Sequence, residues 1–153
     1  MAATSIRIVR ALCAQELAQV LELRGLVFEK EIGHTQVDLE QDHEPATRHF
    51  LAVQSGKALG CLSLVEQPLG EARAHRIRAV AVHPHVQLRG IGSTLLQEAV
   101  SIWQAQETTP VLWLSSLAGA TGFYARHGFS AYEPPYLRLV EGWSQKMVCH
   151  RQP

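Results

Sequence analysis

The sequence predicts an α/β fold in which a mixed, largely antiparallel sheet is flanked by helices. Apolar runs of strand length recur along the chain, and two segments carry apolar residues at helical spacing. The predicted elements follow the order β-α-β-β-β-α-β-α-β-β, which is typical of strands and helices packed in layers. With 153 residues the chain is long enough to bury a sizeable core, so we expect residues 1–153 to form a single domain.

The segment 76–104 is expected to contain a strand, a glycine-containing loop and a helix. Residues 77–82 form an apolar, β-branched run that is typical of a strand buried on both faces. Pro84, Gly90 and Gly92 interrupt this run. The residues that follow predict a helix over 93–104, because the apolar ones fall on one helical stripe: Leu95, Leu96, Ala99, Val100 and Trp103.

The other elements follow from periodicity and from turn residues. Gly56 lies between two apolar runs, which predicts a hairpin. Gly128 is placed to end a helix that begins at residue 117. The expected elements are a strand over 6–9, a helix over 13–26, strands over 50–53, 59–65 and 111–115, a helix over 117–127, and strands over 129–132, 138–140 and 145–148.

The loop before the helix at 93–104 has the features of an anion-binding site. The first N–H groups of a helix have no intrahelical partner, and the helix dipole gives them partial positive charge. Gly90 and Gly92 lack the Cβ atoms that would keep an anion away, and Arg89 adds a positive charge. A tight turn that binds nothing would use the same glycines, so both interpretations remain open from this pattern alone. A dinucleotide fingerprint is excluded because residue 95 is leucine, and no P-loop pattern occurs.

Two motifs in this chain resemble signatures of the GCN5-related N-acetyltransferases (GNAT). Residues 87–92, Q-L-R-G-I-G, are similar to the pattern Q/R-x-x-G-x-G/A, and V-A-V-H-P before them is also typical of that superfamily. Residues 120–129, A-T-G-F-Y-A-R-H-G-F, resemble its element A-x-x-F-Y-x-x-x-G-F. The two motifs occur in the family's order and are separated by a strand-like V-L-W-L-S.

The first half of the chain is similar to a branch of small acetyltransferases related to YjcF and ElaA. The shared pattern is L-R-x-x-V-F-x-x-E, followed by D…D…H-F-L-A-V. The matching residues are Leu23, Arg24, Val27, Phe28, Glu31, Asp38, Asp42, His49, Phe50 and Leu51. This resemblance brings no known substrate with it.

The superfamily resemblance implies acetyl-CoA-dependent transfer of an acetyl group to a primary amine, by direct transfer in a ternary complex. It implies that backbone N–H groups of the loop hold the pyrophosphate and that the preceding strand end pairs with the pantetheine arm. The cofactor-binding residues that it implies are Val80, Ala81, Val82, Gln87, Leu88, Arg89, Gly90, Ile91, Gly92 and Ser93. No cysteine lies in either motif to carry the acyl group, which favours direct attack. The alternatives are a non-catalytic acyl-CoA-binding or regulatory module, and a transferase that uses another acyl-CoA.

Tyr124 is the expected general acid for the departing thiolate, because a phenol with an ordinary pKa of about 10 is protonated at neutral pH. Its alternative role is core packing beside Phe123 and Phe129. Leu117 stands where related enzymes often carry an Asn or Gln that contacts the cofactor, so that hydrogen bond is not expected here. The sequence does not determine a general base, and a water chain would also serve. The candidates are Glu31, Glu40, Asp42, Glu44, His49, Glu66 and His75.

Residues 28–45 are rich in acidic side chains and have little periodicity. Composition alone favours a solvated acidic loop. The superfamily resemblance instead favours a substrate-facing loop, which would attract a cationic amine acceptor, either a small molecule or a peptide.

Charge and composition argue against several other classes of protein. Fourteen basic and fourteen acidic residues cancel, so no basic field indicates nucleic acid or a membrane surface as partner. No apolar run has the length of a membrane span, and the first 30 residues lack a signal-peptide core, so we expect a cytoplasmic protein. Exposed strand edges near the C-terminus would allow a homodimer.

The cysteines and histidines do not predict a metal site. Cys13, Cys61 and Cys149 are widely spaced and fit neither a disulfide framework nor a C-x-x-C metal site, so we expect reduced and largely buried thiols. His83 and His85 alternate at the end of a predicted strand, but no third ligand is near them in the sequence.

Overall fold

The computed structural model describes residues 5–32, 40–87, 89–139 and 141–152. Seven strands form one sheet in the order β1-β2-β3-β4-β5-β7-β6. Every neighbouring pair is antiparallel except β4 and β5, which are parallel. The predicted α/β fold with a mixed, largely antiparallel sheet is therefore confirmed.

The elements have the following bounds. The strands are β1 (Arg7–Arg10), β2 (Arg48–Gln54), β3 (Lys57–Glu66), β4 (Ala74–Val82), β5 (Val111–Leu117), β6 (Ser130–Arg138) and β7 (Gly142–His150). The α-helices are α1 (Ala14–Arg24), α2 (Ile91–Gln106) and α3 (Thr121–Ala125). A π-helix, η1 (Gly25–Ile32), continues α1, and three short 3₁₀ segments are η2 (Glu40–His43), η3 (Pro84–Val86) and η4 (Ala118–Ala120).

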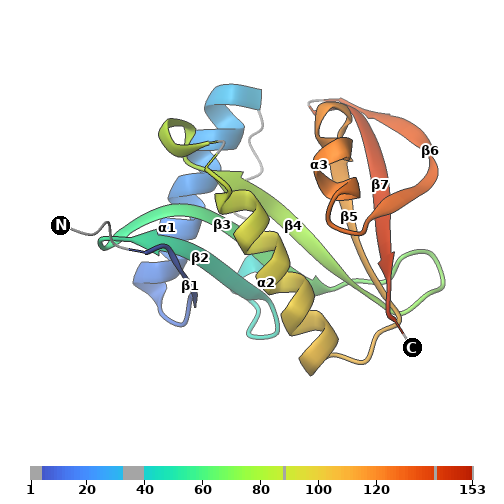
Figure 1. The fold of residues 1–153 in the computed structure, drawn as a ribbon, viewed down its shortest axis with the longest axis horizontal. Coiled ribbons are helices and arrows are strands. Elements are labelled where there is room, and N and C mark those ends of the chain that lie inside the picture. Colours follow the sequence, from blue (N-terminus) through green and yellow to red (C-terminus); the bar gives the residue numbers. More distant parts are fainter. Residues whose placement is uncertain (1–4, 33–39, 88, 140, 153) are drawn as a thin grey trace.

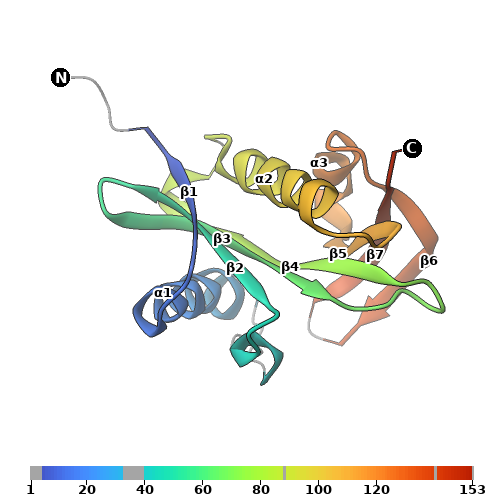
Figure 2. The ribbon, with the colours of Figure 1, turned by 90° about the horizontal axis from the view of Figure 1, so that it is seen from below.

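Helices cover both faces of the sheet, with α2 and α3 on one face and α1 on the other (Figure 2). The apolar stripe predicted for α2 is the stripe that it buries, apart from the partly exposed Val100. Gly60 of β3 lets this helix lie close to the sheet, because a Cβ there would be 3.0 Å from side-chain atoms of both Ile91 and Leu95. On the opposite face, Val20 and Leu23 of α1 belong to a second apolar cluster.

The strands β4 and β5 are joined only at one end. Their register runs from Ala74↔Val111 to Arg76↔Trp113, and beyond it the two strands diverge, as Figure 1 shows. Further along β4, Ala79 has a φ of 54°, and the register with β3 shifts nearby. Such a bulge bends a strand and leaves backbone groups outside the ladder. Residues 79–82 of β4 therefore have β3 on one side and no register partner in β5 on the other.

Two expectations for the C-terminal third were wrong. The helix predicted over 117–127 is much shorter, because Leu117 stays paired with Ser144 in the sheet and a 3₁₀ turn precedes α3. The separate strands predicted over 129–132 and 138–140 are one strand, β6, with a register shift between Tyr132 and Tyr136. β6 passes through Pro134 and Pro135, which an edge strand tolerates because its outer N–H groups need no partner.

Three further expectations need correction. The helix that begins with α1 continues to Ile32, so the start of the acidic segment is helical rather than a loop. The strand at 77–82 is not buried on both faces, since Val80 and Val82 are partly exposed beside the divergence of β4 and β5. Of the three cysteines, all free thiols, only Cys61 is buried.

No helix in the described ranges is both long and apolar enough to cross a membrane.

Candidate functional site

The divergence of β4 and β5 opens a cleft with a volume of about 450 Å³. Residues 76–80 of β4 line one wall, and Leu114, Ser115 and Leu117 of β5 line the other. Tyr124 of α3 also faces this space. A cleft of this size is in the range of small-molecule sites.

The N-terminus of α2 is open to an anion. Gly90 precedes the helix with a φ of 79°, a left-handed conformation that glycine adopts at little cost, and a Cβ there would meet no atom within 4 Å. The N–H and hydroxyl of Thr94 both donate to the Gly90 carbonyl at 3.0 Å, so the first turn is closed. The first turn contains no acidic residue. The first N–H groups of α2 are therefore donors without an intrahelical partner, and no acidic residue of the first turn competes for them.

The loop that leads to this helix is held by hydrogen bonds to the end of β4 and to β3. Gln87 Nε2 donates to the Val82 carbonyl at 3.2 Å, and His83 N–H donates to the Leu59 carbonyl at 2.7 Å. Among the residues implied for cofactor binding, Val80 lines the cleft, and Ala81, Val82, Gln87 and 89–93 follow it along the chain. Leu88 lies outside the described residues.

The two motifs found in the sequence lie against each other. Ser93 Oγ of α2 is 3.0 Å from His127 Nε2, at the end of the second motif. A Cβ on Gly92 would be 3.4 Å from Cζ of Phe123, so glycine allows α3 to pack against the start of α2. Sequence reasoning did not single out His127, although it lies inside the second motif.

Tyr124 lies between the apolar core and the cleft. Its ring packs edge-on against Phe123 and Phe129, with centroids 5.0 and 6.3 Å apart. Its hydroxyl makes no hydrogen bond to any described residue, so it is available to a ligand in the cleft. Burial raises the pKa of Tyr124 to about 12. The phenol therefore stays protonated throughout the physiological range.

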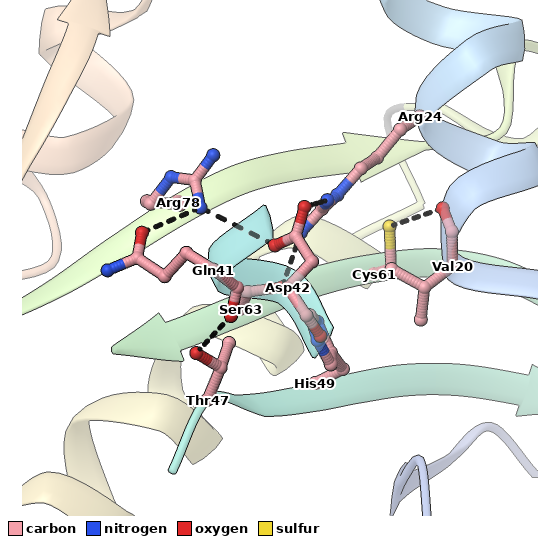
Figure 3. A network of polar contacts seen from close by, with 9 residues as sticks. All are labelled: Val20, Arg24, Gln41, Asp42, Thr47, His49, Cys61, Ser63 and Arg78. Carbon is pink, nitrogen blue, oxygen red and sulfur yellow. Dashed lines mark hydrogen bonds and ion pairs between the residues drawn. The ribbon is translucent and has the colours of Figure 1, made fainter. Parts of the chain in front are cut away.

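Asp42, one candidate base, is held in a buried polar network (Figure 3). Its carboxylate accepts hydrogen bonds from Arg24 at 2.6 and 3.2 Å and lies 3.4 Å from Nη1 of Arg78. The side chain of Asp42 is 0% exposed. Both oxygens of this carboxylate are therefore engaged by guanidinium groups rather than directed at a substrate.

His49, a second candidate, lies in the same network. Its Nε2 is 2.8 Å from the Asp42 carbonyl, which only accepts, so Nε2 carries the proton. In this tautomer the hydroxyl of Ser63 donates to Nδ1 at 2.6 Å, and its oxygen accepts a hydrogen bond from Arg24 at 2.7 Å. Burial lowers the pKa of His49. The lowered pKa keeps the ring neutral at pH 7, and because both ring nitrogens have protein partners, the ring serves the network rather than a substrate.

The remaining candidates do not line the described part of the cleft either. His75 lies at the start of β4, with Nδ1 2.8 Å from Oγ1 of Thr109. Glu44 and Glu66 are exposed, and the side chains of Glu31 and Glu40 lie outside the described structure. The carboxylate that does line the cleft, among described residues, is Glu141 in the turn between β6 and β7. Sequence reasoning missed Glu141 because the sequence around a glutamate in a turn does not indicate which strands its side chain faces.

The described part of the chain holds no group of three His, Cys, Asp or Glu side chains that would bind a metal. His83 and His85 do lie together, with ring centroids 5.2 Å apart.

The acetyltransferase (GNAT) family model matches residues 17–129. The chain belongs to this family. A comparison with curated proteins found no match. Among solved structures, an acyl-CoA N-acyltransferase from Pseudomonas aeruginosa is similar, with 25% identity and a TM-score of 0.81, over 95% of this chain and 99% of the other.

Two other solved structures share the fold of this acetyltransferase. Escherichia coli ElaA is 18% identical with a TM-score of 0.82, over 95% of this chain and 100% of its own. FeeM, an N-acyl amino acid synthase from uncultured soil microbes, is 12% identical with a TM-score of 0.77, over 95% and 93%. The family expected from the two motifs is confirmed, and the named branch member ElaA has the same fold. Family and fold together make this chain an N-acyltransferase of the GNAT type.

Proposed function

We propose that this GNAT enzyme transfers the acetyl group of acetyl-CoA to a primary amine, directly and within a ternary complex. The observation that carries the proposal is the open N-terminus of α2 beside the divergence of β4 and β5. A helix N-terminus without acidic residues in its first turn begins at Ile91, and a strand edge without a register partner in β5 lies at residues 79–82.

The residues present fit acetyl-CoA. The first N–H groups of α2, with the charge of Arg89, would hold its pyrophosphate. The free edge of β4 at residues 80–82 would pair with the pantetheine arm in the manner of an added strand. Acetyl-CoA supplies the acetyl group as a thioester, which is activated toward nucleophiles. The side chain of Leu117 cannot form a hydrogen bond to the cofactor. Backbone donors and Arg89 would therefore provide the polar contacts to acetyl-CoA.

The cleft would then bring the amine to the thioester. The amine nitrogen uses its lone pair to form the new C–N bond, the C–S bond breaks, and sulfur keeps its electron pair. Tyr124 donates a hydrogen bond to that sulfur. A phenol with a pKa of about 12 stabilises a thiolate by this bond rather than by full proton transfer, because thiols have an ordinary pKa of about 8.5. The proton lost by the amine passes to water or to Glu141, the carboxylate of the described lining.

Calorimetric titration with acetyl-CoA, with CoA alone as a control, tests the cofactor assignment. Saturable binding followed by CoA release with an amine supports the proposal. Binding without turnover of any amine would favour a non-catalytic acyl-CoA module instead. Tighter binding and faster turnover with a longer acyl chain would favour a transferase for another acyl-CoA. A folded protein that binds no acyl-CoA would overturn the assignment.

We also propose that residues 1–153 act as one acetyltransferase domain in the cytoplasm, where its three free thiols would stay reduced. A homodimer through the C-terminal hairpin is a further expectation. β6 is an edge strand, and Leu137 and Trp143, which face each other in the register, are 64% and 58% exposed. Sedimentation of the wild type and of Leu137→Lys would test it, since the lysine would shift a dimer to monomer.

A further inference from the structure

Among the described residues, three arginine side chains line the cleft: Arg76 and Arg78 from β4, and Arg138 from β6. Arg76 and Arg78 are two residues apart on one strand, so they project from the same face. Glu141, the carboxylate among the described lining residues, lies 3.9 Å from Arg138 Nη1 and offsets the charge of that arginine. In the described structure Glu141 is not an ion-pair partner of Arg76 or Arg78, so the groups that neutralise these two arginines must be considered separately.

Arg78 shares its carboxylate with a second arginine. Its Nη1 donates to Gln41 Oε1 at 3.2 Å and lies 3.4 Å from Oδ1 of Asp42. The same Asp42 binds Arg24 at 2.6 Å, and both of these side chains are almost fully buried (Figure 3). Arg78 therefore has a carboxylate within ion-pair distance, and Arg76 is the lining arginine whose charge is left to account for.

Arg76 has no carboxylate within ion-pair distance in the described structure. Its guanidinium lies over the indole of Trp113, with Cζ 4.5 Å from the ring centroid, and Trp113 is fixed by a hydrogen bond to the Gln67 carbonyl. Of its five N–H donors, one Nη1–H has an acceptor, Gln67 Oε1 at 3.5 Å, and the buried Nε has none among described residues. The group is therefore held in position with most of its donors unused.

An anion bound in the cleft would neutralise the charge of Arg76. Burial lowers the pKa of Arg76 to about 10, and the nearby charges of Arg78 and Arg138 act in the same direction. Arg76 still carries its proton at neutral pH, so the described wall of the cleft is cationic. A cation that is partly buried without a counterion is unfavourable, and a bound oxyanion removes that cost.

We propose that the acceptor is a compact primary amine that also carries an oxyanion, a carboxylate or a phosphate, and that Arg76 binds this oxyanion. The proposal rests on the proposed acetyl transfer in the same cleft. The planar fork of arginine matches both oxyanions. The volume of about 450 Å³ must also admit the acyl end of acetyl-CoA, which favours a compact acceptor. The acidic segment had suggested a cationic acceptor, but its buried Asp42 faces arginines instead.

Matched acceptors test the charge requirement. Initial rates of CoA release would be compared for amino acids, their decarboxylated amines and their amides, and for phosphoethanolamine against ethanolamine. The amides are needed because they lack the negative charge while, like the amino acids, they have a less basic amine than the decarboxylated compounds. We expect kcat/KM to be about 10- to 100-fold higher with the oxyanion, the usual effect of a charge-assisted hydrogen bond. The carboxylate and phosphate pairs show which oxyanion is preferred.

Variants test the role of Arg76. Arg76→Gln should raise KM about 10- to 100-fold for the oxyanion acceptor, leave the amide little changed, and leave acetyl-CoA affinity unchanged. Arg76→Lys keeps the charge and should restore part of the preference. Arg73→Gln, at an exposed arginine in the β3–β4 connection, is the matched control and should behave as wild type.

Each outcome is decisive. If the folded protein binds no acetyl-CoA, the proposed function falls and this proposal with it. If it binds acetyl-CoA but prefers the amides or the decarboxylated amines, the proposal alone is overturned. Equal losses for both acceptor types in Arg76→Gln would make Arg76 a packing residue and overturn it as well. The proposal also falls if no oxyanion amine is bound or acetylated by the acetyl-CoA-loaded protein.

Discussion

Arg24 Nη1 and Asp42 Oδ2 form a buried ion pair with a distance of 2.6 Å. Their side chains are 1% and 0% exposed, and Arg24 belongs to α1 whereas Asp42 belongs to η2. The pair therefore links η2 to α1 through two residues that lie 18 positions apart in the chain. It also places Gln41, the neighbour of Asp42, in the wall of the cleft. We expect this pair to stabilise both the fold and that wall.

Replacing Asp42 by alanine should destabilise the protein strongly. The change would remove the carboxylate that Arg24 and Arg78 share, and the guanidinium of Arg24 would stay buried. Breaking a buried pair in this way costs about 3–5 kcal/mol. Urea unfolding would measure it. Glu44→Ala, at an exposed residue of the same segment, is the control and should change the free energy of unfolding by less than about 0.5 kcal/mol. Equal small effects of both variants would contradict the structural role of the pair.

Gly90→Glu should abolish acetyl-CoA binding, because it places a carboxylate in front of the α2 N-terminus. We expect a loss of affinity of about 100-fold or more, measured by calorimetry. Gly56→Glu is a closely matched control. Gly56 has a φ of 77° against 79° for Gly90, and a Cβ at either position meets nothing within 4 Å, so the conformational cost is the same.

Gly90→Gln separates charge from backbone strain, since it carries the same strain without the negative charge. We expect it to bind acetyl-CoA more weakly than wild type and more tightly than Gly90→Glu. Wild-type affinity in folded Gly90→Glu would show that the pyrophosphate is held elsewhere.

Tyr124→Phe should lower kcat about 10- to 100-fold, because the phenol would no longer donate a hydrogen bond to the departing sulfur. The affinity for acetyl-CoA should stay nearly unchanged, since the ring and its packing are retained. Tyr132→Phe removes a hydroxyl from the partly buried Tyr132 of β6 and is the matched control. Wild-type kcat in Tyr124→Phe would leave Tyr124 with a packing role alone.

The extent to which the sequence predicted this site depends on how local each feature is. The α2 stripe and the glycines before it are patterns within a dozen or so residues, and periodicity and turn chemistry describe them well. The short α3 depends on Leu117 staying in the sheet against Ser144, a partner 27 positions away that no local pattern reveals. Propensity alone therefore extended that helix too far.

The buried network was recognised only as a pattern. Arg24, Asp42 and His49 appeared in the sequence as positions shared with the ElaA-like branch, without a physical reason. The structure supplies one, since His49 Nε2 binds the Asp42 carbonyl at 2.8 Å while the Asp42 carboxylate binds Arg24. The cationic cleft was missed for the same reason. Nothing in the sequence distinguishes Arg76 and Arg78 from exposed strand positions until the divergence of β4 from β5 is known.

The stability of the protein should fall as the pH drops below about 6.5. Burial lowers the pKa of both His49 and His75 from the ordinary histidine value of about 6.5. Below that value the unfolded chain binds protons that the folded protein excludes, so the free energy of unfolding decreases. This stability is fully present above about pH 7 and is lost as the pH falls toward the lowered folded-state pKa values. For each histidine, a tenfold difference in proton affinity between the folded and unfolded states corresponds to about 1.4 kcal/mol.

Urea unfolding at intervals between pH 5 and pH 8 would measure this dependence. His49→Gln can still donate to the Asp42 carbonyl but does not titrate, so its stability should depend less on pH over this range than that of the wild type. His150→Gln, at an exposed histidine, should keep the wild-type dependence. If His49→Gln keeps the full wild-type slope, His49 is not held neutral by burial and does not contribute to the pH dependence.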